Sequence, residues 1–234
     1  MNAARRLIVA LDVPDAAAAL RMARRLRGLV RTVKVGSILF TAAGPGIIRR
    51  LRALGFDVML DLKFFDIPST VEWSCRAAAR HRVALLTVHA SGGREMLQAA
   101  MRGVASGATT ARHGRPRVLA VTVLTSTPAL PRMHGMASRV RQLAIDAQEA
   151  GCDGVVASAR EAQDLRKVLK TRMLIACPGI RPRGTSRDDQ RRVATPAQAL
   201  RDGADVLIVG RPILEAADPR AAIRMMLKDM EGGR

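Results

Sequence analysis

Eight short runs of aliphatic and β-branched residues recur along the chain at fairly even spacing, and each run is nearly continuous in apolar residues. Such runs are typical of strands that are covered on both faces in a parallel sheet. The eight predicted strands are Leu7–Val13, Thr32–Gly36, Asp57–Lys63, Leu85–Ala90, Val118–Leu124, Gly154–Ser158, Met173–Pro178 and Val206–Gly210. This repetition constrains the fold more than any other feature of the sequence.

The segments between the runs have a helical period and are rich in Ala, Leu and Arg. Asp15–Gly28 starts at a residue that can cap a helix and ends at glycine, and Pro45 stands where a first helical residue would. Four later segments are expected to be helical in the same way: Gly92–Val104, Ser138–Ala150, Ala159–Leu169 and Pro219–Met230.

Eight strand–helix alternations in 234 residues, without a shift in composition or a low-complexity linker, predict a single α/β domain over residues 1–234. The expected architecture is a (β/α)₈ TIM barrel with its active site at the C-terminal ends of the strands. A doubly wound open sheet is the alternative, because alternation alone does not distinguish a closed sheet from an open one. The glycines do not form a GxGxxG motif after the first strand, which disfavours a dinucleotide-binding version.

Composition narrows the class of protein further. Hydrophobic residues make up 48% of the chain and charged residues 25%, which is typical of a soluble globular protein. No apolar run approaches the ~18 residues of a membrane span, and no signal peptide is recognisable at the amino terminus. The three cysteines lack metal-ligand spacing. We therefore predict a cytoplasmic location and no membrane partner.

The net charge of +19 raises the alternative of a polyanion-binding module. Two observations disfavour it. The basic residues are nearly all Arg and are spread through helical stretches, and aromatic residues, which form stacking platforms for single strands, amount to only 2%. We therefore expect no nucleic-acid partner, and we interpret the charge as solvated surface that also attracts a small anionic substrate.

Charged residues lie at the ends of the second and third predicted strands. Asp61 and Lys63 are two positions apart on the third strand and so share one face. If that face points into the barrel mouth, Lys34 from the second strand adds a second cation and Asp66 from the following loop a second anion. A structural ion pair is the alternative, but buried ion pairs give little net stability after desolvation. We predict that the four charges form a catalytic cluster.

The last two strands end in a pattern that predicts a phosphate site. Gly210 and Arg211 follow the eighth strand, and Arg181 follows the seventh, with Gln190 in the polar loop beyond. Barrels of this kind commonly bind phosphate after strands seven and eight, and a guanidinium contacts phosphate oxygens in a bidentate manner. A lone Gly-Arg would more simply be a helix start with a solvated arginine, but the pattern occurs at both strand ends.

Other side chains carry weaker signals. His89 ends the fourth strand, and we interpret it as a structural or site-shaping histidine. No two histidines have the spacing of a metal site, so no metal is predicted. The sequence contains neither a Ser-His-Asp order that indicates a catalytic triad nor a Walker A motif.

The run Asp61–Thr70 resembles the DxKxxDIPxT signature of bacterial-type orotidine 5′-phosphate decarboxylases. The resemblance covers essentially the whole chain, in order. The further matching strings are Ala10–Asp12, Lys34–Gly36, Thr87–Ala90, Thr122–Ser126, Pro178–Pro182, Asp189–Arg192 and Val209–Pro212.

This resemblance implies a decarboxylation of orotidine 5′-phosphate (OMP) to UMP and CO₂ without a cofactor, the last step of de novo UMP biosynthesis. It implies that Lys63 protonates the ring carbon that loses CO₂ and that Asp61 faces the departing carboxylate. Lys34 and Asp66 complete the charged array, and Lys34 also belongs to the substrate contacts. The remaining substrate contacts that it implies are Asp12 and Thr70 to the ribose, Thr125 beside the pyrimidine, and Arg181, Gln190, Gly210 and Arg211 around the phosphate.

The resemblance also implies a homodimer, in which Asp66 and Thr70 reach into the partner's site. The alternative within the same fold is a related phosphate-binding barrel lyase, of the hexulose-phosphate synthase or ketogulonate-phosphate decarboxylase type, which uses magnesium. The second lysine and the intact motif through Thr70 favour the pyrimidine substrate.

Overall fold

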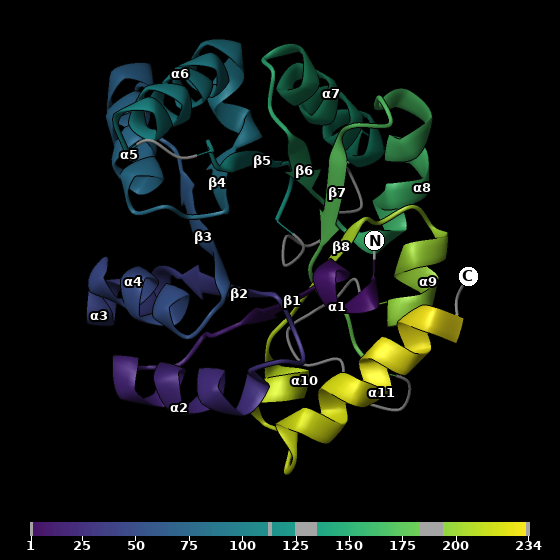
Figure 1. The fold of residues 1–234 in the computed structure, drawn as a ribbon. Helices are drawn as coiled ribbons and strands as arrows, with labels where there is room; N and C mark the ends of the chain where they lie inside the picture. The colour runs from purple at the N-terminus through teal and green to yellow at the C-terminus, as the bar shows by residue number, and fades with distance from the viewer. Residues whose placement is uncertain (1, 112–113, 125–134, 183–193, 233–234) are drawn as a thin grey trace.

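The computed structural model describes residues 2–111, 114–124, 135–182 and 194–232 and contains a closed barrel of eight parallel strands. The strands follow one another around the barrel in chain order, and β8 pairs with β1 (Figure 1). They are β1 (Leu7–Ala10), β2 (Thr32–Gly36), β3 (Asp57–Phe64), β4 (Leu85–His89), β5 (Arg117–Val121), β6 (Gly154–Val156), β7 (Leu174–Cys177) and β8 (Val206–Val209). The predicted TIM barrel is confirmed, and the open-sheet alternative is wrong.

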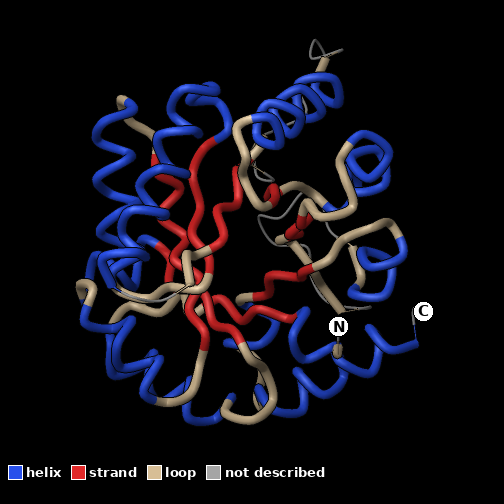
Figure 2. The backbone as a smooth tube through the Cα atoms, turned by 45° about the horizontal axis from the view of Figure 1, so that its top comes forward, coloured by secondary structure: helices blue, strands red, loops and turns tan. Residues whose placement is uncertain are grey.

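Helices form a ring outside the strands (Figure 2). They are α1 (Ala3–Arg6), α2 (Ala16–Leu26), α3 (Ser37–Ala43), α4 (Gly46–Ala53), α5 (Pro68–Arg80), α6 (Gly93–Ala111), α7 (Met136–Glu149), α8 (Ala159–Val168), α9 (Pro196–Arg201), α10 (Arg211–Leu214) and α11 (Pro219–Gly232), with a short 3₁₀ turn at Ala90–Gly92. Among the described residues, no helix combines the length and apolar character needed to cross a membrane.

Local sequence explains how several of these helices begin. Asp15 caps α2 as predicted, because its side chain accepts a hydrogen bond from the Ala18 amide. Pro45 precedes α4 as its N-cap instead of being its first helical residue. The helices α1, α3, α5, α9 and α10 were not among those expected, and four of them have seven residues or fewer. Such short helices contain too few turns to show a hydrophobic period.

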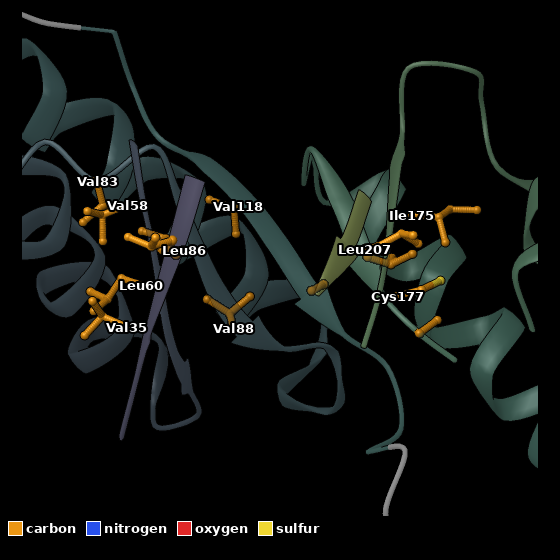
Figure 3. Packing of buried hydrophobic residues seen from close by; sticks show 14 of the residues in the cluster. Val35, Val58, Leu60, Val83, Leu86, Val88, Val118, Ile175, Cys177 and Leu207 are labelled. Atoms are coloured by element: carbon orange, nitrogen blue, oxygen red, sulfur yellow. The ribbon is translucent and has the colours of Figure 1, made fainter. Parts of the chain in front are cut away.

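The core has two layers, which follow from the two-residue period of the strands. Figure 3 shows part of the outer layer, where Val58 and Leu60 of β3 and Leu86 and Val88 of β4 are buried in the cluster between barrel and helices. The inner layer fills the barrel with Ile8, Ala10, Met59, Leu119, Val121, Val156, Ala176, Val206 and Ile208. Asp61 is two residues beyond Met59, so the period places it inward.

Arginine–aspartate pairs tie the amino-terminal rim of the barrel together. Asp153, just before β6, accepts a hydrogen bond from the backbone N–H of Val118 and pairs with Arg115 at 2.7 Å. Asp205, just before β8, accepts a hydrogen bond from the backbone N–H of Ile175 in β7 and pairs with Arg166. Each carboxylate thus joins neighbouring segments at the rim opposite the strand ends that carry the predicted site.

Two glycines let α5 and α6 pack closely beside each other. A Cβ atom on Gly103 would collide with the backbone carbonyl oxygen of Glu72, and one on Gly107 would collide with that of Arg76. Backbone atoms cannot move aside as a flexible side-chain end can. The position of α5, which follows the β3 loop, therefore depends on the absence of side chains at these two places.

We predict that Gly107→Ala lowers the free energy of unfolding by about 1–3 kcal/mol, since overpacking forces the two helices apart. The control is Gly46→Ala, because a Cβ there meets nothing within 4 Å. Urea unfolding of both variants and the parent measures the effect. Equal stability of the Gly107 variant and the parent would contradict the close packing.

Candidate active site

A pocket of about 570 Å³ opens at the C-terminal ends of the strands, a size suited to a small-molecule ligand. Residues that follow or end β1, β2, β3, β7 and β8 provide its polar groups. Its lining is Ala10, Asp12, Lys34, Ile38, Met59, Asp61, Lys63, Val121, Val123, Leu124, Val156, Pro178, Gly179, Arg181, Ile208, Gly210, Arg211 and Glu215.

Four charged side chains, from β2, β3 and the segment that follows β1, form an alternating chain of contacts in this pocket. The Nζ atom of Lys34 lies 2.9 Å from Oδ1 of Asp12 and 3.3 Å from Oδ2 of Asp61. The same Oδ2 of Asp61 lies 2.9 Å from Nζ of Lys63. The order is therefore anion, cation, anion, cation, and Asp61 stands between two ammonium groups.

Burial is greatest in the middle of this array, because Asp12, at the opposite end from Lys63, is 41% exposed. The side chains of Lys34 and Asp61 are 9% and 11% exposed, whereas that of Lys63 is 34% exposed. Lys34 contacts two carboxylates, and Lys63 contacts one among the described residues. The ammonium group of Lys63 is therefore the more accessible of the two.

Neighbouring opposite charges keep the buried side chains of Asp61 and Lys34 ionised. Burial alone would raise the pKa of Asp61, but the charges of Lys34 and Lys63 and its hydrogen bonds outweigh burial and hold the pKa below its usual value. Burial alone would likewise lower the pKa of Lys34, but Asp61 and Asp12 outweigh it and raise that pKa. Asp61 is thus a carboxylate and Lys34 an ammonium ion at neutral pH.

The backbone at Lys63 departs from regular strand geometry. Lys63 has φ of 50°, in the left-handed region that residues other than glycine rarely adopt. The pairing of β3 with β4 also shifts register between Leu60 and Phe64. Irregular strands of this kind are common beside active sites, where they redirect a side chain.

Gly36 ends β2 and makes room for the array. A Cβ atom at this position would lie 2.9 Å from Nζ of Lys34 and 3.0 Å from Oδ1 of Asp12. A side chain here would crowd both charged groups, and the ammonium end of Lys34 would have to shift. The sequence places Gly36 at the end of a predicted strand and in a matching string, but neither pattern indicates this role.

The ends of β7 and β8 supply a second set of polar groups in the same pocket. Arg181 is buried, and its Nη1 donates a hydrogen bond to the carbonyl oxygen of Ile180. Arg211 and Gly210 line the pocket after β8, and Gly179 lines it in a left-handed conformation with φ of 74°. The pocket is therefore lined by two arginines besides the charged array, and their role as a phosphate site stays a prediction.

Two predicted site residues are not brought into this pocket within one chain. Asp66 is exposed, and its Oδ1 accepts a hydrogen bond from the amide of Ile67 instead of joining the array. Thr70, in the first turn of α5, is exposed as well. Thr125 and Gln190 lie outside the described residues.

His89 does not line the pocket. Burial and the charge of Lys63 lower its pKa, and its ring meets that of Phe65 edge-on, with centroids 5.9 Å apart. The structural or site-shaping role expected of His89 from the sequence stays a prediction. Burial raises the pKa of each of the three cysteines to about 12, so none is an activated thiol.

Comparison with known proteins places this chain in a family. The model of the orotidine 5′-phosphate decarboxylase / HUMPS family matches residues 5–226. A protein of Moorella thermoacetica named orotidine 5′-phosphate decarboxylase is 46% identical, over 99% of this chain and 94% of the relative. The chain belongs to this family.

Other members support the assignment in sequence and in structure. The Halorhodospira halophila orotidine 5′-phosphate decarboxylase is 48% identical over 93% of this chain and 92% of the relative. The crystal structure of the Lactobacillus acidophilus orotidine 5′-phosphate decarboxylase superposes with a TM-score of 0.83 at 37% identity, covering 97% of this chain and 99% of that chain.

The apolar floor of the pocket and one carboxylate in its lining were not predicted from the sequence. Met59, Val121, Val156 and Ile208 lie beneath the polar groups. The strand period could have identified them, since each is an inward position. Glu215, at the end of α10, also lines the pocket. No motif marks this residue.

The lowered pKa of Asp61 predicts a stability that depends on acid pH. A carboxylate with a lowered folded pKa stabilises the fold above its ordinary pKa of about 4, and this contribution is lost as pH falls through the folded value. We therefore expect Asp61→Asn to unfold more easily than the parent at pH 7, and we expect this difference to shrink in acid.

Chemical unfolding between pH 3 and pH 7 measures that difference. Glu231→Gln, which removes an exposed carboxylate near the end of α11, is the matched control and should show no such trend. A deficit of Asp61→Asn that is the same at every pH would mean that the ion contacts are not its source.

Proposed function

We infer that this protein is an orotidine 5′-phosphate decarboxylase, which converts OMP to UMP and CO₂ in pyrimidine nucleotide biosynthesis. The observation that carries this conclusion is the alternating array of Asp12, Lys34, Asp61 and Lys63 in the pocket of a barrel whose relatives bear that name. An enzyme of nucleotide synthesis also fits the predicted cytoplasmic location.

The reaction needs a cation placed where negative charge develops. When the bond between the ring and the carboxylate breaks, CO₂ leaves and the electron pair stays on the ring carbon, in the plane of the ring. The π system gives that electron pair little stabilisation, so a preorganised ammonium group must supply it. The same ammonium group then delivers a proton to the carbon, giving UMP, and recovers a proton from water.

We assign this proton donor to Lys63 because of its place in the array. Lys34 is buried between two carboxylates, so its protons are already engaged. Lys63 is at the end of the array, is more exposed and contacts Asp61 alone among the described residues. A proton on Lys63 can therefore be transferred without breaking the contacts that hold the rest of the array.

Asp61 is proposed to face the carboxylate that leaves. It is held ionised by its two cations, so a second carboxylate beside it experiences repulsion that ends when CO₂ departs. The ammonium group of Lys63 is present both before and after the bond breaks. The repulsion between the two carboxylates exists only before it breaks. Asp61 also orients Lys63 through the 2.9 Å contact.

The remaining pocket residues are proposed to bind the nucleotide. Arg181 and Arg211, with Gly210, would surround the phosphate, and Gln190 would join them. The pocket is lined by both arginines after β7 and β8, where such barrels bind phosphate. Phosphate contacts far from the reacting bond supply binding energy that helps to position the base.

Ribose and base contacts complete the proposed substrate site. Asp12, which lines the pocket beside Lys34, would bind a ribose hydroxyl, and Thr70 another. Thr125 would lie by the pyrimidine. The net charge of +19 gives an anionic nucleotide a favourable long-range attraction to the protein.

The active unit is proposed to be a homodimer in which Asp66 and Thr70 complete the partner's site. Both side chains are exposed in the single chain. Phe65 and Ile67, on either side of Asp66, are 61% and 64% exposed, and Trp73 on α5 is 64% exposed. Large apolar side chains that gather around a motif residue are typical of a surface that a second subunit covers.

We predict that Lys63→Ala lowers kcat for OMP by at least about a thousandfold, because it removes both the stabilising charge and the proton. The control is Lys167→Ala, which removes an exposed lysine of α8 that pairs with Asp164. A spectrophotometric assay of OMP loss measures both. Near-parental activity of the Lys63 variant would overturn the assignment. A parent that leaves OMP unchanged and acts on a sugar phosphate in an EDTA-sensitive reaction would support the magnesium-dependent alternative.

Mixing two inactive variants tests the shared site. If Asp66 acts in the partner's site, a dimer of one Lys63→Ala and one Asp66→Ala subunit contains one intact site and one site with both defects. Unfolding the two variants together and refolding them should then restore about a quarter of the parental activity per subunit, the share of intact sites in a random two-fold dimer.

The control for this experiment pairs Lys63→Ala with Asp61→Ala. Those two defects belong to the same subunit's site, so every mixed dimer has one or other defect in each site and no activity should return. If the mixture containing Asp66→Ala is equally inactive, Asp66 does not act across an interface.

A further inference from the structure

We propose that Thr87 is a positioning residue of this site, whose hydroxyl holds the carboxylate of Asp61 and the backbone of Lys63 in one arrangement. The inference rests on the proposed function, in which these two residues carry the chemistry. Thr87 is in the middle of β4, beside β3, and is fully buried. It does not line the pocket.

The hydroxyl of Thr87 makes two hydrogen bonds whose directions are fixed. The backbone N–H of Lys63 donates to its Oγ1 at 3.0 Å, since an amide nitrogen can only donate. The hydroxyl proton is then donated to Oδ1 of Asp61 at 2.9 Å, since an ionised carboxylate can only accept. One buried side chain thus joins both members of the proposed catalytic pair.

Thr87 stands opposite the irregular part of β3. On β3 the paired residues Leu60 and Phe64 are four positions apart, while their partners on β4, Leu86 and Val88, are two positions apart. The extra residues of β3 therefore bulge, and Thr87 is the single β4 residue between the two pairs. Its hydroxyl bonds the Lys63 amide within this bulge.

The bulge has a cost that a local contact must offset. Lys63 has φ of 50°, a region in which the backbone of a residue other than glycine is strained. Losing the hydroxyl would leave the partly buried amide of Lys63 without this bond and would allow the backbone to relax. A displacement of about 1 Å in a reacting group can reduce the rate by about a hundredfold.

The second bond fixes how Asp61 is turned. Thr87 holds Oδ1, which leaves Oδ2 facing both ammonium groups, at 3.3 Å from Lys34 and 2.9 Å from Lys63. Without this bond the carboxylate could rotate about its last torsion and share its charge differently between the two lysines. The Thr87 hydroxyl therefore acts on Lys63, the proposed proton donor, in two ways. It holds the backbone of Lys63, and it orients Asp61, the counterion of Lys63.

The test compares Thr87→Val, which has nearly the same shape without the hydroxyl, with Thr87→Ser, which keeps the hydroxyl. We expect Thr87→Val to lower kcat for OMP between about tenfold and a hundredfold with KM changed much less, because the chemical step is misaligned while the nucleotide contacts remain. Thr87→Ser should retain most of the parental kcat.

The matched control is Thr122→Val. Thr122 is a buried threonine just after β5 whose hydroxyl donates to the carbonyl oxygen of Val156, without contact to the charged array among the described residues. Its loss should cost stability comparable to that of Thr87→Val and leave kcat near the parental value. A fall in kcat of the same size in both variants would reduce Thr87 to a structural residue.

Two further outcomes separate this inference from the proposed function. If the parent does not decarboxylate OMP, the proposed function fails; if the parent is active and Thr87→Val keeps its kcat, only the positioning role fails. Should Thr87→Val not fold, Thr87→Ser and Thr87→Ala form a second pair that differs only in the hydroxyl oxygen. Equal kcat values in that pair would overturn the role of the hydroxyl.

Discussion

The contact of one carboxylate with two ammonium groups is the interaction on which the pocket depends. Asp61 and Lys34 are buried, and neither charge would be tolerable there alone, because removing an ion from water costs several kcal/mol. Asp61 compensates Lys34 and Lys63, and Lys34 in turn is compensated by Asp12. Lys34 and Asp61 stay charged in spite of burial because their neighbours carry the opposite charge, and these contacts join the four residues into one electrostatic unit.

The barrel makes this unit possible by separating its interior into layers. Apolar side chains such as Met59 and Val121 fill the barrel below the charges, and the next inward position of β3 carries Asp61. The array therefore has a dry floor on one side and an open pocket on the other. Opposite charges interact more strongly there than at the protein surface, since less water screens them.

Much of this arrangement could be predicted from the sequence because it follows from short-range periodicity. The apolar runs predicted the barrel, and the two-residue period placed Asp61 and Lys63 on one face, as the structure shows. Arg181 and Arg211 were expected in one pocket for the same reason, because both follow neighbouring strands.

What the sequence did not reveal depends on contacts between strands. The bulge of β3 and the bonds to Thr87 arise from pairing with β4, which no periodicity within a single strand encodes. A polar residue at a strand end is also ambiguous by itself. Ser158 ends the sixth predicted strand, but its side chain caps α8 in a capping box with Glu161.

The two rims of the barrel hold their carboxylates for opposite purposes. At the amino-terminal rim, Asp153 and Asp205 are bound by arginines and by strand amides, and these contacts tie neighbouring strands together far from the pocket. Chain assembly and chemistry thus draw on separate sets of side chains. The loops above the apolar floor could therefore be exchanged to recognise a different anionic metabolite. Such an exchange would leave the rim contacts that hold the strands together unchanged.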